Sequence, residues 1–431
     1  MSQSDEPPSP APSLAPLPAA SPAASPADGD VLASLRAGID EIDGQIARLL
    51  HDRAAIVAQV RKAKQSSGTH VYDPEREETV LDRALTRAQG AFPKVAMRAV
   101  FREIISGCVS LQSSAAVAFL GPSGTFTEMA AHALFGSSTS YEERPTIQGV
   151  LDAVLRETAA YGVVPLETSD DGVVIRLIEG LIAGSLKIRR EFIANVTFAL
   201  CSLAPELSSI ERVYAHHNAL GQCRRWLLEN LPHVGLVSVE SPGEAMRRAK
   251  ADPHGATLAS EKAARRSGMP VIARSASDRT DSTIRFIVVG REDGLKGMRM
   301  LQCKTLVAIV NRELSLSGLL SKFSAHTVEV LQVTSVPRTS DGAPVLLFEL
   351  DGKRSDAKMT ALMGEIVASG AEVHVLGTFA RHHAVYLSEP PSAVMPISHA
   401  SISIAGLEEK LGEPAVDRDA RAGHEAGALR T

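Results

Sequence analysis

Two basic residues on one predicted helix have the spacing to bind a small dianion. From Leu32 to Ala63, apolar residues recur every three or four positions, as on one face of a long helix, and Arg53 occupies a position in that seam. A buried guanidinium costs several kcal/mol unless an anion meets it. Lys64 follows 11 residues later on about the same face, roughly 16 Å away. The alternative is an Arg53 side chain that pairs with a core acid or extends to solvent.

Two further segments place polar groups on predicted helices. The stretch VYDPEREE predicts a helix with Asp73 as N-cap and Pro74 as its first residue, which puts Arg76 and Glu77 in the first turn. A plain solvated helix start is the alternative, because acidic residues favour any helix N-terminus. A third helix is predicted through VAMRAVFREIISGCVSLQ, and Gln112 continues its apolar seam.

The segments LRAGIDEIDGQIARLLHDRAAIVAQVRKAK, DPERE and FREIISGC followed by LQ make residues 32–113 resemble the all-helical chorismate mutases. Cys108 departs from the other small residues that this family often has at that position. The resemblance implies that the active site comprises Arg36, Arg53, Lys64, Asp73, Arg76, Glu77 and Gln112.

The reaction implied by this resemblance converts chorismate to prephenate and needs no nucleophile, metal or cofactor. Arginines would clamp the carboxylates, while Lys64 and Gln112 would donate hydrogen bonds to the ether oxygen. Arg36 lies 17 residues before Arg53, roughly 25 Å along one helix. Because Arg36 cannot reach the same ligand from its own chain, a swapped homodimer or a higher homo-oligomer is implied.

A different pattern begins at residue 115, where strand, glycine turn and helix alternate. The stretch AAVAFLGPSGTFTEMAAHALFG is followed by more units of this kind, which predicts a mostly parallel, covered sheet. The turn lacks the G-K-[ST] of a nucleotide-binding loop. The helix N-terminus after Gly124, Thr125 and Thr127 would still suit a carboxylate.

The motifs GPSGTF, VVPLETSDDG and TIRF, in this order, make residues 115–292 resemble prephenate dehydratases. That resemblance implies two α/β lobes with the substrate in the cleft between them, and loss of carbon dioxide and the ring hydroxyl without a cofactor. The substrate-binding residues implied are Thr125, Glu167, Thr168, Ser169, His216, Asn218, Ser241, Thr283 and Arg285.

The catalytic threonine of the family's Thr-Arg-Phe motif is replaced here by Ile284. Thr283 points to the opposite face of a strand, although a local bulge would re-aim it. Two hypotheses follow: both reactions run with a replacement donor such as Thr283 or Thr168, or the second region binds ligand without turnover. A third is that the cleft accepts arogenate or a related acid.

Residues 303–383 predict the element order βαββαβ and resemble the ACT domains that bind phenylalanine as a feedback inhibitor. The effector positions implied are Gly318, Leu319 and Ser335. The family's Glu-Ser-Arg-Pro is Thr334-Ser335-Val336-Pro337 here, so both charges are lost. A dimerising module without an effector is the alternative.

Composition sets the remaining limits. A chain of 431 residues suggests two to four domains, and a net charge of −5 with 4% aromatic residues argues against a nucleic-acid partner. Four scattered cysteines indicate reduced thiols and no metal site. Residues 1–30 predict a disordered leader without signal-peptide features, and 384–431 a disordered tail. With no membrane-length apolar run, we expect a cytoplasmic multidomain enzyme: helical over 31–113, two-lobed α/β over 115–292, and α+β over 303–383.

Overall fold

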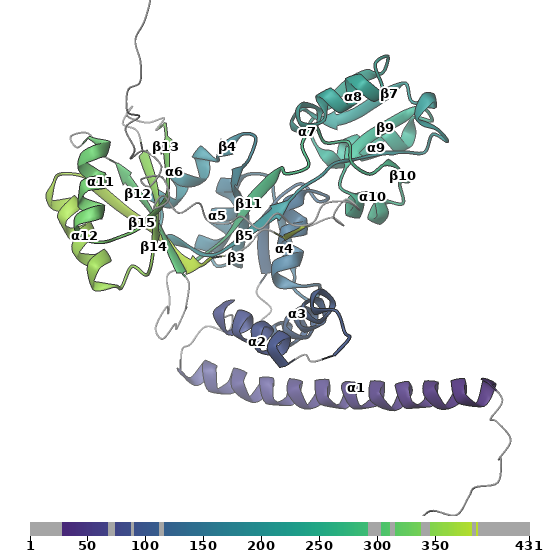
Figure 1. Cartoon of the computed structure of the whole chain (residues 1–431), viewed down its shortest axis with the longest axis horizontal. Coiled ribbons are helices and arrows are strands. Elements are labelled where there is room, and N and C mark those ends of the chain that lie inside the picture. Colours follow the sequence, from purple (N-terminus) through teal and green to yellow (C-terminus); the bar gives the residue numbers. More distant parts are fainter. Residues whose placement is uncertain are drawn as a thin grey trace, which may run out of the picture. The chain divides into compact units, whose positions relative to one another are not determined.

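The computed structural model describes residues 28–67, 74–87, 90–111, 116–291, 303–310, 315–337, 345–381 and 385–386 (Figure 1). Most of the predicted leader and tail lie outside these ranges. Two residues of the predicted tail form strand β16 (Val385–Tyr386), which pairs with strand β5 (Leu186–Asn195). The prediction of a wholly disordered tail is therefore wrong at this strand.

The three predicted helices are present as α1 (Asp28–Ser67), α2 (Pro74–Arg87) and α3 (Lys94–Ser110). Pro74 begins α2 as predicted, because proline has no N–H to leave unsatisfied in the first turn. Leu81 and Ile105 are buried in α2 and α3, whereas the seam of α1 stays open, with Ile39 57% and Leu49 67% exposed. Within the described ranges, no helix combines the length and the hydropathy that spanning a bilayer would require.

The first α/β lobe contains a mixed sheet with helices on both faces. Its elements are β1 (Ala116–Leu120), α4 (Phe126–Phe135), β2 (Tyr141–Arg144), α5 (Ile147–Leu155), β3 (Ala159–Thr168), β4 (Gly172–Val173), α6 (Ile175–Ala183), β5 and β11 (Thr283–Arg291). The main strands lie in the order β5-β11-β3-β1-β2. Helices α5 and α6 pack on one face and α4 on the other.

The second lobe is an excursion of the chain between β5 and β11. Its elements are β6 (Ala199–Ser202), β7 (Arg212–His216), α7 (His217–Gln222), α8 (Arg224–Asn230), β8 (Gly235–Val239), α9 (Pro242–Ala251), β9 (Gly255–Ala259), α10 (Glu261–Ser267) and β10 (Val271–Ala273). Its strand order is β10-β6-β9-β7-β8. The prediction of mostly parallel sheets is wrong, because β5 and β11, which carry the chain out and back, pair antiparallel.

Residues 303–380, the C-terminal module, have the predicted order βαββαβ. The elements are β12 (Cys303–Val310), α11 (Leu316–Ala325), β13 (Val330–Val336), β14 (Val345–Asp351), α12 (Ala357–Ala368) and β15 (Glu372–Ala380). Strand β15 pairs with β5 at Gly377 and Ile188. This pairing joins the sheet of the first lobe and the sheet of the C-terminal module into one sheet of 11 strands. A Cβ on Gly377 would lie 2.3 Å from the carbonyl oxygen of Ile188, so this close approach requires glycine.

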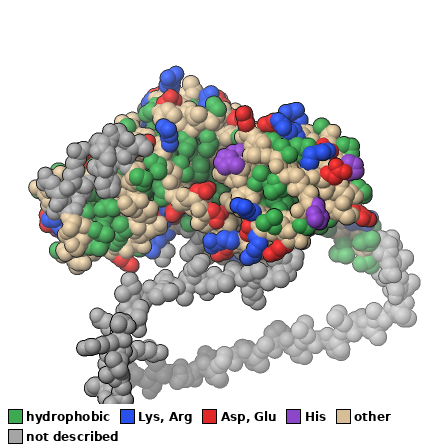
Figure 2. Space-filling model, turned by 90° about the horizontal axis from the view of Figure 1, so that it is seen from above, with side chains coloured by type: hydrophobic (Ala, Val, Ile, Leu, Met, Phe, Trp, Pro, Cys, Tyr) green, Lys and Arg blue, Asp and Glu red, His purple; other side chains and the backbone are tan. Residues whose placement is uncertain are grey.

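The charged side chains on one face of the molecule are mixed in sign. Figure 2 shows acidic and basic groups interspersed there, with apolar areas between them. On the described part of that face, no large area of positive charge stands out that would attract a polyanion.

Candidate active sites

Helix α3 contacts helix α1 at Arg53. The half-buried guanidinium donates to Sγ of Cys108, and Arg61 donates to the carbonyl oxygen of Leu111 at 2.9 Å. Cys108 was not among the predicted residues of the mutase site. A signal for it existed in the sequence, because Cys108 lies one helical turn before Gln112 on the same face of the predicted helix. The structure thus brings Arg53, the polar residue in the apolar seam of α1, to the C-terminal end of α3.

The other predicted mutase residues are only partly placed. In the first turn of α2, Glu77 is buried and Arg76 is exposed. Arg36 is exposed on α1, roughly 25 Å from Arg53 along the helix. The side chain of Lys64, and both Asp73 and Gln112, lie outside the described residues.

The glycine turn before α4 already holds a carboxylate of its own chain. Thr125 is the N-cap of α4 and accepts from the N–H of Glu128, while Oε2 of Glu128 accepts from the N–H of Gly124 at 2.6 Å. Oε1 of Glu128 pairs with Arg266 of α10 at 2.6 Å. Burial acts to raise the pKa of Glu128, but Arg266 and the Gly124 N–H lower it more. The T-x-x-E capping box was readable in the sequence, and Thr125 serves as a cap here.

A pocket of about 330 Å³ lies between the two lobes. Its volume falls in the range of roughly 300–1,000 Å³ that is common for small-ligand sites. The lining residues are Asp170, Asp171, His217, Asn218, Gly221, Gln222, Asp278, Arg279 and Ser282. Asn218 was predicted to bind substrate. Asp170, His217 and Ser282 also line the pocket, and each is adjacent in the chain to a predicted residue. The remaining lining residues were missed, although Asp170 and Asp171 stood within the recognised LETSDDG motif.

The charge of this pocket is mostly negative. Both carboxylate oxygens of Asp278 accept backbone N–H groups at the start of α8, at 2.9 Å and 2.8 Å. Arg279 pairs with Asp281 through two hydrogen bonds of 3.0 Å and 3.1 Å. This pair lowers the pKa of Asp281 and raises that of Arg279. A substrate carboxylate would therefore compete with Asp281 for the arginine that lines the pocket.

The segments that follow β3 and precede β11 are tied together beside the pocket. The N–H of Thr283 donates to Oγ of Ser169 at 3.1 Å, and the N–H of Ser169 donates to the carbonyl oxygen of Thr283 at 2.9 Å. The hydroxyl of Thr168 accepts from the N–H of Asp171 at 2.8 Å. The hydroxyls of Thr168 and Ser169, both predicted to bind substrate, therefore accept hydrogen bonds from the backbone here.

Two predicted residues of the second lobe cap helices. His216 is the N-cap of α7, with Nδ1 accepting from the N–H of Asn218 at 3.4 Å, and its ring lies 4.0 Å from that of His217. Burial and the neighbouring His217 lower the pKa of His216. Ser241 is the N-cap of α9 and accepts from the N–H of Glu244 at 3.2 Å. Ser241 is not among the residues that line the pocket.

Ile284 packs into the core of the first lobe. It lies against the apolar cluster that contains Phe286 and Val288. The pairing of β11 with β5 is continuous from Thr283 to Val288, so alternation along β11 is undisturbed there. The expected bulge exists, but it lies in β3, where Leu166 is skipped between the partners of Arg285 and Phe286. A bulge in β11 that turns Thr283 to the face of Ile284 is therefore absent from this strand.

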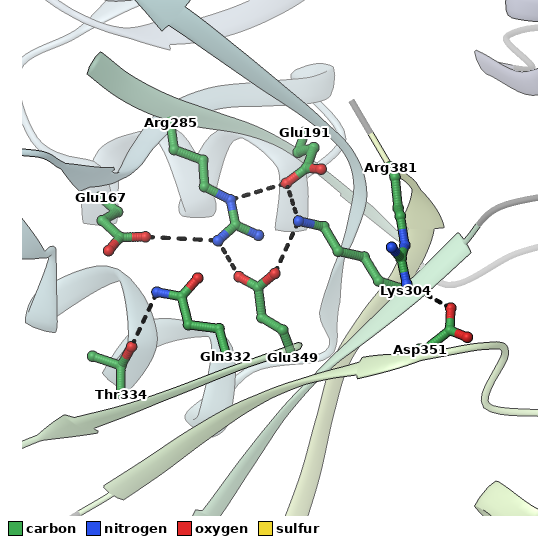
Figure 3. Close-up of polar contacts among 9 residues, drawn as sticks. All are labelled: Glu167, Glu191, Arg285, Lys304, Gln332, Thr334, Glu349, Asp351 and Arg381. Atoms are coloured by element: carbon green, nitrogen blue, oxygen red, sulfur yellow. Dashed lines mark hydrogen bonds and ion pairs between the residues drawn. The ribbon is translucent and has the colours of Figure 1, made fainter. Parts of the chain in front are cut away.

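Arg285 and Glu167 lie in a buried ion cluster that joins the first lobe to the C-terminal module (Figure 3). Nε of Arg285 is 2.9 Å from Glu191, and its NH1 contacts Glu349 directly and Glu167 at 3.6 Å. Lys304 lies 2.9 Å from both Glu191 and Glu349. Arg285 is 8% and Glu191 0% exposed. Arg285 and Glu167 are predicted substrate-binding residues, and in the structure both side chains face the C-terminal module.

The three predicted effector residues are divided between helix α11 and strand β13. Gly318 lies in the first turn of α11, where its N–H donates to Oγ of Ser315 at 3.1 Å. Leu319 is fully buried in the core beneath α11 and α12, and Ser335 is exposed on β13.

Comparison with known proteins places both regions in one family. A sequence profile described as chorismate mutase type II matches residues 35–113, and one described as prephenate dehydratase matches residues 117–294. A bifunctional chorismate mutase/prephenate dehydratase of Aquifex aeolicus is 33% identical over 81% of this chain and 97% of its own length. The chain belongs to the bifunctional chorismate mutase/prephenate dehydratase family. Both resemblances predicted for residues 32–113 and 115–292 are thereby confirmed.

Further relatives support this family membership. The bifunctional chorismate mutase/prephenate dehydratase of Neisseria gonorrhoeae is 30% identical over 81% of this chain and 97% of its own length. A solved prephenate dehydratase from Arthrobacter aurescens, in complex with L-Phe, is 28% identical with a TM-score of 0.55, covering 62% of this chain and 90% of that one. A quorum-quenching acylase, 20% identical with a TM-score of 0.53 over 62% of this chain and 98% of that one, shares the fold.

Proposed function

We propose that this chain catalyses two consecutive reactions of phenylalanine biosynthesis: chorismate to prephenate, and prephenate to phenylpyruvate. The observation that carries the proposal is that profiles for both activities match one chain, to which a bifunctional relative aligns over 97% of its own length. The alternative, a dehydratase-like region that only binds ligand, is less well supported, because the match to the dehydratase profile runs through residues 117–294.

The mutase reaction would be carried by electrostatic preorganisation. A pericyclic rearrangement has no proton to transfer, so the site needs to hold the dicarboxylate compact and stabilise negative charge on the ether oxygen. Arg53 and Arg76 would clamp carboxylates, with Lys64 and Gln112 donating to the ether oxygen. The place of Arg53 at the contact between α1 and α3 supports this role, because ligand bound there would touch two helices.

A second copy of the chain would complete the mutase site. The seam of α1 remains exposed along its length in one chain, with Leu35 62% and Ile56 61% exposed. A helix of 40 residues with such a seam is stabilised by burying it against a partner helix. An antiparallel partner would bring its Arg36 toward Arg53 of the first chain, which places the two arginines on one ligand.

The dehydratase reaction would take place in the pocket between the lobes. Loss of the ring hydroxyl requires a hydrogen-bond donor at the departing oxygen, and the pocket offers donors from α7 and from the segment before β11. Of the predicted residues, Asn218 lines this pocket, and His216 and Ser169 are each next in the chain to a residue that lines it. Arg279 would supply the cationic group of this pocket.

The C-terminal module would act as an ACT-type regulatory domain with phenylalanine as effector. Its βαββαβ order supports this, and a solved prephenate dehydratase that is 28% identical was crystallised with L-Phe. Because Leu319 is buried and Ser335 lies on the strand at the end of the sheet, an effector would sit where a second module adds its own residues.

The test is a pair of direct assays on the purified full chain. Chorismate consumption and phenylpyruvate formation from prephenate are measured separately, with arogenate as a competing substrate in the second assay. Turnover of both chorismate and prephenate supports the proposal. Turnover of chorismate alone would reduce the second region to a binding module, and a preference for arogenate would change its substrate.

A further inference from the structure

The dehydratase reaction needs a donor that Ile284 cannot supply, and the structure points to a neighbouring hydroxyl. The departing ring oxygen develops negative charge as its bond to carbon breaks, and a positioned hydrogen bond stabilises that charge. Ile284 carries no polar atom and packs against the core cluster of Phe286 and Val288. The donor must therefore come from another residue that reaches the same pocket.

Ser282 lies on the same face of the chain as Ile284. The N–H of Val196 donates to the carbonyl oxygen of Ser282 at 2.9 Å, so pairing with the β5 side continues one residue before β11 begins. Side chains two positions apart on an extended chain share a face. Ser282, Ile284 and Phe286 therefore lie in succession on one face of the chain.

Ser282 is a hydroxyl-bearing residue in the wall of the pocket between the lobes. Ser282 is only 3% exposed, yet it is one of the nine residues that line this pocket and the one among them with a hydroxyl. No group in the described part of the chain is hydrogen-bonded to its Oγ. A buried hydroxyl that lines a pocket is well suited to meet a ligand, because it has little competing water.

We propose that Ser282 is a catalytic residue of the dehydratase reaction and donates to the ring hydroxyl that leaves prephenate. This inference rests on the proposed function. The bond between the ring carbon and its carboxylate breaks, and that electron pair moves through the ring as carbon dioxide departs. The bond from the ring to the hydroxyl oxygen breaks with its pair on oxygen, which takes the Ser282 proton to become water. A water molecule that enters the pocket after the products leave then reprotonates Ser282.

The two hydroxyls predicted from the sequence are worse placed for this step. Thr283 lies on the opposite face of β11, the face that Arg285 shares and that leads to the ion cluster. The hydroxyl of Thr168 is held in a turn by the N–H of Asp171 at 2.8 Å. Neither threonine lines the pocket.

The experiment compares Ser282→Ala with Thr283→Val in the purified full chain. These variants of adjacent residues each remove one hydroxyl, from opposite faces of the extended chain where β11 begins. Phenylpyruvate formation from prephenate gives kcat and KM, and chorismate consumption by the same preparations reports folding. We expect Ser282→Ala to lower the dehydratase kcat by about 100-fold or more with little change in KM, because the hydrogen bond strengthens in the transition state. Thr283→Val should stay within about threefold of the unmodified chain.

Each outcome decides the matter. A Ser282→Ala chain that keeps more than about a third of the dehydratase kcat overturns the role of Ser282 while leaving the dehydratase activity established. Equal losses in both variants, with mutase activity intact, also overturn it, because a role confined to one face predicts a difference. If the unmodified chain consumes chorismate but does not convert prephenate, the dehydratase assignment fails first and the role of Ser282 fails with it.

Discussion

Arg285 of strand β11 forms a buried ion pair with Glu349 of strand β14, so a residue of the dehydratase motif is bound to the C-terminal module. Glu191 and Lys304 extend the contact, as Figure 3 shows. Burial acts to lower the pKa of Arg285, but the surrounding carboxylates raise it more, so the guanidinium stays charged. The dehydratase lobe and the C-terminal module are therefore joined by charge as well as by the sheet.

Breaking this ion pair should destabilise the protein strongly. Glu349→Gln leaves Arg285 and Lys304 buried with one carboxylate fewer, and loss of one partner of a buried pair typically costs about 3–5 kcal/mol. Asp351→Asn is the matched control, since it removes the exposed pair of Asp351 with Arg381 at 2.7 Å, where we expect less than about 1 kcal/mol. Urea unfolding measures both, and similar losses in the two variants would contradict the importance of the buried cluster.

The mutase site should depend on Arg53 and tolerate changes elsewhere on α1. Arg53→Ala should lower kcat/KM for chorismate by at least about 100-fold, because several kcal/mol of transition-state stabilisation are lost. Arg48→Ala, at an exposed position of the same helix, should leave the rate within about twofold. Near-normal turnover by Arg53→Ala would show that the site lies elsewhere.

Active sites shared between two chains would make complementary variants rescue each other. Arg36→Ala and Arg53→Ala chains should each be nearly inactive with chorismate. Mixed by co-expression, they should recover roughly a quarter of the unmodified activity, because half of the dimers are mixed and each mixed dimer has one intact site. No recovery, with mixed dimers demonstrated by differential tags, would mean that each site uses arginines of one chain.

Freeing Arg279 should strengthen prephenate binding. Asp281→Asn removes the carboxylate that holds Arg279 at 3.0 Å and 3.1 Å, and we expect KM for prephenate to fall by about twofold or more with little change in kcat. Arg279→Met should have the opposite effect on KM. If both variants leave KM unchanged, Arg279 does not contact the substrate.

The contact between the lobes should weaken in acid. Arg266 and the Gly124 N–H lower the pKa of Glu128 below its ordinary value of 4.5, so the stability that the pair contributes is present above that pH and is lost as pH falls through the lowered pKa. Arg266→Met should therefore destabilise the chain at pH 7, and the effect should shrink as pH falls through the lowered pKa of Glu128. Repeating the comparison in Glu128→Gln chains is the control, because there Arg266→Met should have little effect at any pH in the series.

Much of the fold could be predicted because it depends on local periodicity and turn chemistry. The seam of α1, the start of α2 at Pro74 and the βαββαβ order of residues 303–380 each follow from residues close together in sequence. Thr125 and Ser241, predicted as substrate-binding residues, are helix N-caps in the structure, and each is followed three residues later by glutamate, the pattern of a capping box.

What the sequence by itself determined is the set of residues available to each site, together with the alternation that separates Ser282 and Ile284 from Thr283 and Arg285. Only the tertiary structure decided where each face leads. The face of Ser282 reaches the pocket between the lobes, and the face of Arg285 meets Glu349, more than 60 residues away in sequence. The physical reason is that strand periodicity fixes which side chains share a face, whereas the order of strands in the sheet determines what that face packs against.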